Sequence, residues 1–180
     1  MMNKIVAVIG SGTEAHTRLS QPLGKYLAEN GFHLINGGGA GVMEKTARAF
    51  YETQNRKGKV IGVLPSSHAC ETEMDRSQYK SPPNYPNGFT EIIIRTHLPD
   101  SGTKGKLTSS RNHIIILSAD LIVALPGGSG TRSEIELALD YKKPVILLSP
   151  DEEWKSFKGK AEIAAGLDDV IRFIESEGKC

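Results

Sequence analysis

The residues best suited to chemistry form one short segment, residues 126–131 (Pro-Gly-Gly-Ser-Gly-Thr), which is followed by Glu134. Glycines let backbone N–H groups come close to a bound phosphate, and a helix that starts there adds the positive end of its dipole. Thr131 supplies a hydroxyl group at the expected helix start. A carboxylate in the first turn either stabilises the helix end or acts as an acid beside a bound sugar. We therefore predict a phosphate-binding segment, with both roles open for Glu134.

Two further glycine-rich turns follow predicted strands, at residues 10–12 (Gly-Ser-Gly) and 37–41 (Gly-Gly-Gly-Ala-Gly). In an open parallel sheet these turns share the carboxyl edge with residues 126–131, and ligands bind at that edge. Each turn alone can also be a tight connection between a strand and a helix. The three turns together favour a ligand site.

Two common nucleotide-binding motifs are not met. Residues 10–15 fit a permitted form of the dinucleotide fingerprint, but Asn36 and Gly37 stand where an acidic residue would bind a ribose hydroxyl. A Walker motif fails because Leu107 replaces the required Ser or Thr and Asp100 replaces the first glycine. The sequence therefore disfavours NAD binding and P-loop ATP hydrolysis.

Arg111 lies in a polar segment, residues 108–112, just before an apolar run at residues 114–117. Arginine in this place can bind a phosphate or carboxylate through two parallel hydrogen bonds, or it can be a solvated surface residue. Glu136 is a second acid near Glu134, but two helical positions turn it about 200° away. We expect Glu136 to face elsewhere.

Short β-branched apolar runs alternate with helix-like segments along the chain. The predicted strands are residues 4–9, 32–36, 59–64, 91–95, 120–125 and 144–149. The predicted helices are residues 19–29, 43–51, 109–118 and 133–141, and a helix is also expected from residue 161, with Ile163, Leu167, Val170, Ile171 and Ile174 on its buried side. Continuous apolar runs are typical of strands buried on both faces. We predict one domain over residues 1–180, an α/β Rossmann-like three-layer fold with a mainly parallel sheet and helices on both faces.

Residues 65–89 and 96–108 interrupt this alternation. The first segment is polar and rich in proline and turn signals, and it is longer than connections in compact domains usually are. The second contains Gly102 and Gly105, which favour a flexible loop. We expect both segments to overhang the carboxyl edge of the sheet, the first as a lid or a partner surface.

Composition and charge argue against several functions. Lys and Arg number 22 against 21 Asp and Glu, so the net charge of +1 gives no support for binding nucleic acid or a membrane surface. No apolar stretch approaches the ~20 residues that cross a bilayer. Cys70 and Cys180 do not suggest a disulfide framework, and residues 68–75 follow no standard metal-ligand spacing. We expect a cytoplasmic protein without metal or cofactor.

These motifs together resemble the LONELY GUY family, long described as lysine decarboxylase-like. The family signature pairs an arginine-containing helix with Pro-Gly-Gly-x-Gly-Thr-x-x-Glu, which residues 126–134 match at every fixed position. Residues 37–43 are similar to a second family segment. The resemblance implies a homodimer that hydrolyses the N-glycosidic bond of AMP or cytokinin riboside monophosphates, giving the free base and ribose 5-phosphate. A decarboxylase would need pyridoxal phosphate on a lysine, and no motif identifies one.

The sequence departs from the hydrolase pattern at two positions. Asn112 follows Arg111 where those enzymes typically have lysine, and Glu44 follows Met43 where they have glycine. The Arg-Asn form resembles a sister branch that includes molybdenum-cofactor carrier proteins. Three functions therefore stay open: a phosphoribohydrolase, a non-catalytic carrier of a phosphorylated cofactor, and a nucleotide sensor.

For the hydrolase, the resemblance implies that Arg111 and Glu134 are catalytic. Glu134 would stabilise an oxocarbenium-like state and activate water, while Arg111 would position the nucleotide or assist the leaving base. A small phosphorylated molecule and a second copy of the chain are the expected partners. The other residues that we expect to bind the ligand are Gly10, Ser11, Gly37, Gly38, Gly39, Asn112, Gly127, Gly128, Ser129, Gly130 and Thr131.

Overall fold

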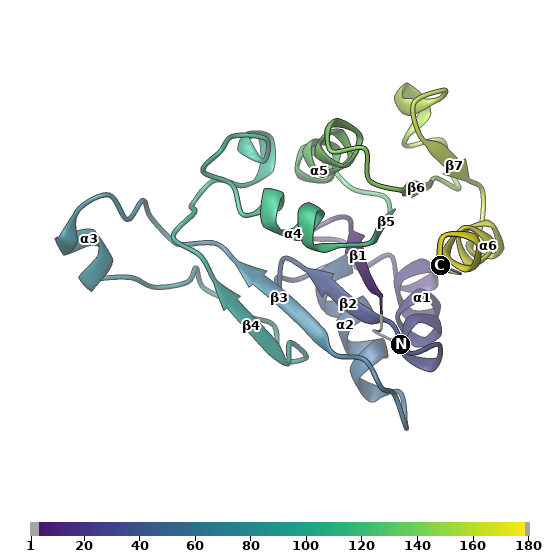
Figure 1. Cartoon of the computed structure of the whole chain (residues 1–180), viewed down its shortest axis with the longest axis horizontal. Coiled ribbons are helices and arrows are strands. Elements are labelled where there is room, and N and C mark those ends of the chain that lie inside the picture. Colours follow the sequence, from purple (N-terminus) through teal and green to yellow (C-terminus); the bar gives the residue numbers. More distant parts are fainter. Residues whose placement is uncertain (1–3, 179–180) are drawn as a thin grey trace.

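Seven short segments form one sheet in which every neighbouring pair of strands is parallel (Figure 1). The computed structural model describes residues 4–178. Its strands are β1 (Ile5–Ile9), β2 (His33–Asn36), β3 (Val60–Leu64), β4 (Ile92–Arg95), β5 (Leu121–Ala124), β6 (Val145–Leu148) and β7 (Glu162–Ala164). Strands β5 and β6 are buried at every position, as continuous apolar runs predict for strands covered on both faces.

Helices cover both faces of the sheet. They are α1 (Thr17–Glu29), α2 (Val42–Glu52), α4 (Asn112–Ser118), α5 (Ser129–Asp140) and α6 (Leu167–Gly178), with the short α3 (Glu73–Ser77) apart from them. Leu23 of α1 and Ile174 of α6 pack in one core cluster with Val8 of β1. Ile116 of α4 and Ile135 of α5 pack in a second cluster on the opposite face. These two cores confirm the predicted three-layer α/β fold.

The strand order, β4-β3-β2-β1-β5-β6-β7, reverses direction at β1. The chain builds one half of the sheet outward from β1 and then returns to place β5 on the other side, with Ile9 opposite Ala124. A crevice forms at such a reversal, beyond the carboxyl ends of the strands. The backbone N–H of Ser11 donates to the carbonyl of Pro126 at 3.0 Å, so the first and third glycine turns lie side by side.

The prediction for the carboxyl-terminal segment was wrong in part. Residues 162–164 form strand β7, in which Ile163 lies opposite Leu147 of β6, and the helix begins only at Leu167. Ile163, expected to be buried, is 37% exposed because β7 is an edge strand. Only Ala164 of the strand is buried. A strand this short has no periodicity that a sequence pattern can detect.

Two further helices, α4 and α5, begin three and four residues away from their predicted starts. Helix α5 starts at Ser129 rather than at residue 133, directly after Gly128 in extended conformation. Helix α4 starts at Asn112 rather than at residue 109, because Ser110 is held in a turn and in an isolated bridge to Asp100. Both shifts place the helix starts at the candidate chemical residues.

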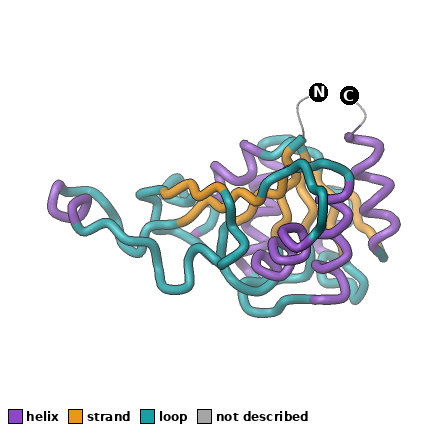
Figure 2. Tube along the Cα trace, turned by 90° about the horizontal axis from the view of Figure 1, so that it is seen from below, coloured by secondary structure: helices purple, strands orange, loops and turns teal. Residues whose placement is uncertain are grey.

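The connection from β3 to β4 leaves the body of the molecule as an arm, residues 65–91, that carries α3 at its tip (Figures 1 and 2). No residue of α3 is buried, so this helix does not cover the sheet. Ile92, Ile93 and Ile94 of β4 are consequently 44%, 37% and 39% exposed. Within the described residues, no helix combines the length and apolarity that a membrane crossing requires.

Candidate functional site

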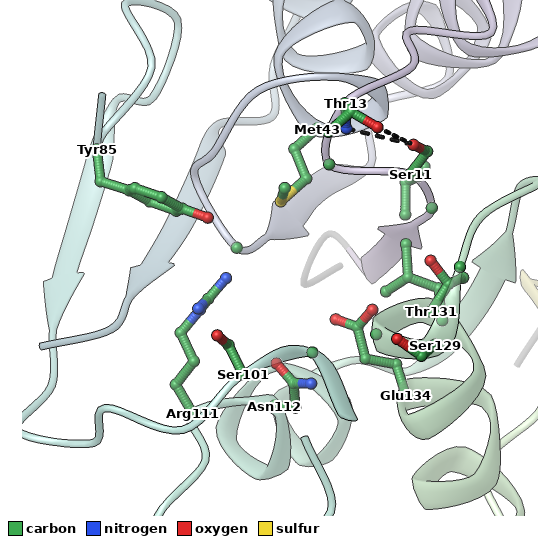
Figure 3. A pocket seen from close by; sticks show the side chains of 18 residues that line it. Ser11, Thr13, Met43, Tyr85, Ser101, Arg111, Asn112, Ser129, Thr131 and Glu134 are labelled. Atoms are coloured by element: carbon green, nitrogen blue, oxygen red, sulfur yellow. Dashed lines mark hydrogen bonds between the residues drawn. The ribbon is translucent and has the colours of Figure 1, made fainter. Parts of the chain in front are cut away.

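A cavity of about 310 Å³ lies at the carboxyl edge of the sheet, at the reversal between β1 and β5. This volume is at the lower end of the range for small-molecule sites. All three glycine turns reach the cavity, together with the starts of α4 and α5 (Figure 3). Its lining residues are Val8, Ile9, Gly10, Ser11, Gly12, Thr13, Gly37, Met43, Tyr85, Ser101, Gly102, Arg111, Asn112, Gly128, Ser129, Gly130, Thr131 and Glu134.

The amino-terminal end of α5 forms one wall of the cavity. Gly128 is the N-cap residue and makes no side-chain capping bond, and the first intrahelical bond runs from Arg132 N–H to Gly128 C=O at 3.0 Å. The N–H groups of Ser129, Gly130 and Thr131 therefore have no acceptor within the helix. Free N–H groups and the positive end of the dipole favour an anionic ligand.

Two residues next to this wall, Gly127 and Ser11, have structural roles that their close contacts explain. A Cβ atom on Gly127 would lie 2.2 Å from Thr131 Oγ1 and 2.8 Å from Ser11 N, so only glycine fits there. Ser11 Oγ accepts hydrogen bonds from Thr13 N at 3.2 Å and Glu14 N at 2.9 Å. The Ser11 hydroxyl thus stabilises the first turn, and the neighbouring Gly10 and Gly12 line the cavity.

Glu134 extends from α5 into the cavity (Figure 3). Burial raises the pKa of its carboxyl group from 4.5 to about 7, even though the nearby Arg111 cation acts in the opposite direction. Desolvation dominates because the Arg111 charge is the one opposing influence and no hydrogen bond from the described residues adds to it. A group of this kind changes protonation near neutral pH and can serve as a general acid or base.

Arg111 directly precedes α4, and only 5% of its surface is exposed. Its Nε and Nη1 atoms are buried and have no hydrogen-bond partner among the described residues. The guanidinium carbon lies 5.6 Å from the centre of the Tyr85 ring, and a Cβ atom on Gly37 would lie 2.2 Å from Nη2. Because a buried cation without a partner is costly, these free N–H groups mark a place for an anionic or polar ligand group.

A family model for the SLOG cluster4 family matches residues 3–172. The chain belongs to the SLOG cluster4 family. It is 26% identical over 166 residues to a cytokinin riboside 5'-monophosphate phosphoribohydrolase of Rhodococcoides fascians, covering 88% of this chain and 72% of that protein. The expected resemblance to LONELY GUY proteins and their relatives is confirmed.

Two solved structures are similar to this SLOG cluster4 chain over nearly its whole length. The molybdenum cofactor binding protein of Rippkaea orientalis is 30% identical, with a TM-score of 0.71 and 98% of both chains covered. The molybdenum cofactor carrier protein of Chlamydomonas reinhardtii is 27% identical, also with a TM-score of 0.71 and 98% of both chains covered. The chain is therefore similar in sequence to a named hydrolase, and in sequence and fold to proteins named for binding or carrying molybdenum cofactor.

Most of the residues singled out in this SLOG cluster4 sequence line the one cavity, but three do not. Gly38, Gly39 and Gly127 lie outside the lining. Gly38 has φ of 72° and accepts a hydrogen bond from Asn87 N at 2.7 Å, while the Gly39 carbonyl accepts one from Asn87 Nδ2 at 2.9 Å. These two glycines contact the arm rather than the cavity, because the second turn bends toward β3.

The structure of this SLOG cluster4 protein also shows the roles of Glu136 and Asn36, which the sequence placed outside the expected chemistry. Glu136 does not line the cavity and instead pairs with Lys106 at 3.5 Å. Asn36 is fully buried, and its side chain bonds Gly38 N at 2.8 Å and Met43 O at 3.2 Å. Asn36 thus supports the second turn instead of supplying the acid of a dinucleotide site. No cluster of three or more His, Cys, Asp or Glu suited to a metal occurs within residues 4–178.

The sequence alone did not identify Met43, Tyr85, Ser101 and Gly102 as lining residues. Tyr85 comes from the arm, and Ser101 and Gly102 come from the loop after β4. Both segments were expected to overhang this edge, but their sequences contain no motif that marks one residue. Only the unusual length of the two connections signalled that they contribute to the site.

Proposed function

We propose that the protein is a phosphoribohydrolase that cleaves the N-glycosidic bond of AMP or a cytokinin riboside monophosphate. One observation carries this proposal: Glu134 and Arg111 extend into the same cavity, and neither side chain forms a hydrogen bond or ion pair within the described residues. An acid and a cation that are free to act on a ligand stand beside a helix end suited to phosphate.

The proposed chemistry assigns each group a step. The start of α5 binds the 5'-phosphate through its free N–H groups, which places the ribose ring next to Glu134. The ionised carboxylate removes a proton from water, whose oxygen attacks C1' of the ribose as the bond to the base nitrogen breaks. The departing nitrogen takes a proton from solvent, which balances the proton that water gave to Glu134, and Arg111 stabilises negative charge on the phosphate or the base. The products are the free base and ribose 5-phosphate.

Release of free base tests the proposal directly. Wild-type protein and Glu134→Gln are incubated with AMP and with cytokinin riboside monophosphates, and the base is separated by chromatography. General-base catalysis increases a reaction rate about 10²–10⁴-fold, so Glu134→Gln should release base at least about 100-fold more slowly than the wild type. Glu136→Gln is the matched control, since Glu136 lies on the same helix outside the cavity. No base from wild type with any of these substrates contradicts the proposal.

A second candidate is a non-catalytic carrier of a phosphorylated cofactor. It is favoured by the similarity, at 30% identity, to the molybdenum cofactor binding protein of Rippkaea orientalis and by Asn112, which stands where hydrolases typically have lysine. Asn112 is 4% exposed and lines the cavity. A carrier would retain a pterin after purification from cells that make molybdenum cofactor, which oxidation and fluorescence detect. A nucleotide sensor would show thermal stabilisation by AMP with neither turnover nor retained pterin.

We also propose that the chain forms a homodimer through the uncovered edge strand β4. Its three isoleucines are exposed because no helix covers the sheet there, and exposed edge strands pair readily with another copy. Ile93→Lys should convert a dimer to a monomer in light scattering coupled to gel filtration. Ile163→Lys is the matched control, since Ile163 is 37% exposed in the opposite edge strand, β7. A wild-type monomer, or an unchanged mass for Ile93→Lys, contradicts this assembly.

A further inference from the structure

The arm between β3 and β4 returns to the cavity at one anchored point. Asn87 is 8% exposed and bonds both Gly38 O, through its backbone N–H at 2.7 Å, and Gly39 O, through Nδ2 at 2.9 Å. Its Oδ1 accepts from Phe89 N at 3.1 Å and from Thr90 Oγ1 at 3.3 Å. These bonds tie the arm to the second glycine turn. A residue two positions before Asn87 is thereby held at the cavity, whereas α3 at the tip has no buried residue.

That residue is Tyr85. A Cβ atom on Gly39 would lie 2.7 Å from Tyr85 Oη, 2.8 Å from Cζ and 2.9 Å from Met43 Cε, so the ring occupies the space that a side chain at Gly39 would need. Met43 and Tyr85 together line the cavity beside Arg111 (Figure 3). The hydroxyl group of Tyr85 points inward, and no hydrogen bond joins it to the other residues drawn (Figure 3).

The cavity is therefore chemically divided. The wall at the start of α5 offers backbone N–H groups and the Thr131 hydroxyl, which suit a phosphate. The opposite wall offers an aromatic ring and a thioether beside the Arg111 guanidinium, and neither the ring nor the thioether binds phosphate. Aromatic rings and polarisable sulfur contact flat unsaturated rings favourably. A ligand with a phosphate at one end and a planar ring at the other matches both walls.

We infer that Tyr85, with Met43, forms the subsite for the planar heterocycle of the ligand and determines its preference for a phosphate that carries a ring over the bare sugar phosphate. This inference rests on the proposed function, which places the phosphate of the ligand at the start of α5. It adds a specificity residue that lies outside the glycine-rich motifs, on a segment far from them in the sequence.

Binding rather than turnover tests this subsite. Affinities for AMP and for ribose 5-phosphate are measured by titration calorimetry in the Glu134→Gln background, with and without Tyr85→Ala. Stacking on an aromatic side chain contributes enough that Tyr85→Ala should weaken AMP binding about tenfold or more. Ribose 5-phosphate, which has no ring to stack, should bind with unchanged affinity. Tyr85→Phe should restore the preference for AMP, since it restores the ring without the hydroxyl.

The matched control is Tyr79→Ala in the same arm, because Tyr79 does not line the cavity and its hydroxyl only approaches Ser81 Oγ at 3.5 Å. Equal weakening of both ligands by Tyr85→Ala would mean that the ring only supports Arg111, which overturns the subsite. An unchanged AMP affinity in Tyr85→Ala, or no preference for AMP before the substitution, overturns it as well.

Base release by the wild-type protein is measured separately, so the two proposals fail independently. If the wild type releases base while Tyr85→Ala keeps its preference for AMP, only the subsite is wrong. If AMP binds with the Tyr85-dependent preference but no base appears, the subsite stands and the hydrolase proposal is wrong.

Discussion

The two walls of the cavity are built in different ways. The wall at the start of α5 comes from one stretch, residues 128–134, and its candidate ligand groups are mainly backbone atoms. The facing wall combines Met43, Tyr85 and Arg111 from three separate segments, and side chains carry its chemistry. The proposed phosphate site is thus local in the sequence, whereas the proposed subsite for the ring depends on how three distant segments fold. Substitutions in the two walls should therefore have different signatures.

The largest expected effect comes from Arg111 in the second wall. Arg111→Met removes charge-assisted hydrogen bonds and should weaken AMP binding about 10- to 100-fold. The same change should raise the free energy of unfolding of the free protein, because a buried cation without partners on Nε and Nη1 is replaced by an apolar side chain. Calorimetric binding and urea unfolding measure the two effects.

Arg111→Lys serves as the control because it keeps the charge but loses the planar fork of the guanidinium group. We expect Arg111→Lys to bind AMP more weakly than the wild type, as Arg111→Met does. A stability that falls in Arg111→Met would show that the guanidinium group supports the fold and would break the contrast between the two walls.

The protonation of Glu134 gives a pH dependence in the first wall. With a pKa of about 7, the carboxylate that we propose to activate water is progressively lost below that pH, so kcat/KM should fall about tenfold per pH unit there. Glu136→Gln should keep this profile, because Glu136 lies outside the cavity. A rate that instead rises as pH falls through 7 would identify Glu134 as an acid and not a base.

Stability should depend on the same group. The folded-state pKa of Glu134 is raised above 4.5, so its contribution to stability is fully present below pH 4.5 and is lost as pH rises through about 7. The free energy of unfolding of wild type relative to Glu134→Gln should therefore fall by about 1–3 kcal/mol between pH 4.5 and pH 8. Urea unfolding of both proteins at the two pH values measures this change. A difference in unfolding free energy that stays the same at both pH values would contradict the desolvation of Glu134.

Much of the fold follows from local sequence because its strands are continuous apolar runs. Leu121–Ala124 and Val145–Leu148 lie inside the predicted ranges, since side chains buried on both faces must all be apolar. The start of α5 was missed because Gly130 and Ser129 are poor helix formers, so local preference does not favour a helix where α5 begins. The position of Tyr85 depends on hydrogen bonds of Asn87 to a turn 48 residues away, which no local pattern encodes.

A smaller effect is expected at two neighbouring glycines, Gly128 in the first wall and Gly127 directly before it. Gly127→Ala would place a methyl group 2.2 Å from Thr131 Oγ1 and should lower the free energy of unfolding by about 1–3 kcal/mol. Gly128→Ala is the matched control, because a Cβ atom there meets nothing within 4 Å. Thermal unfolding separates the two variants, and equal midpoints would show that the contact between the first and third turns is not tightly packed.

The smallest effect concerns the anchor of the second wall. Asn87→Ala removes the Nδ2 bond to Gly39 O and the acceptor for Phe89 N, so the free energy of unfolding should fall by about 1–2 kcal/mol. AMP affinity should fall a few-fold because Tyr85 loses its fixed position, whereas ribose 5-phosphate affinity should not change. Ser77→Ala, which removes an exposed bond to Met74 O in α3, should alter neither affinity. If Asn87→Ala weakens both ligands alike, the second turn and not the ring responds to the anchor, and the two walls act as one unit.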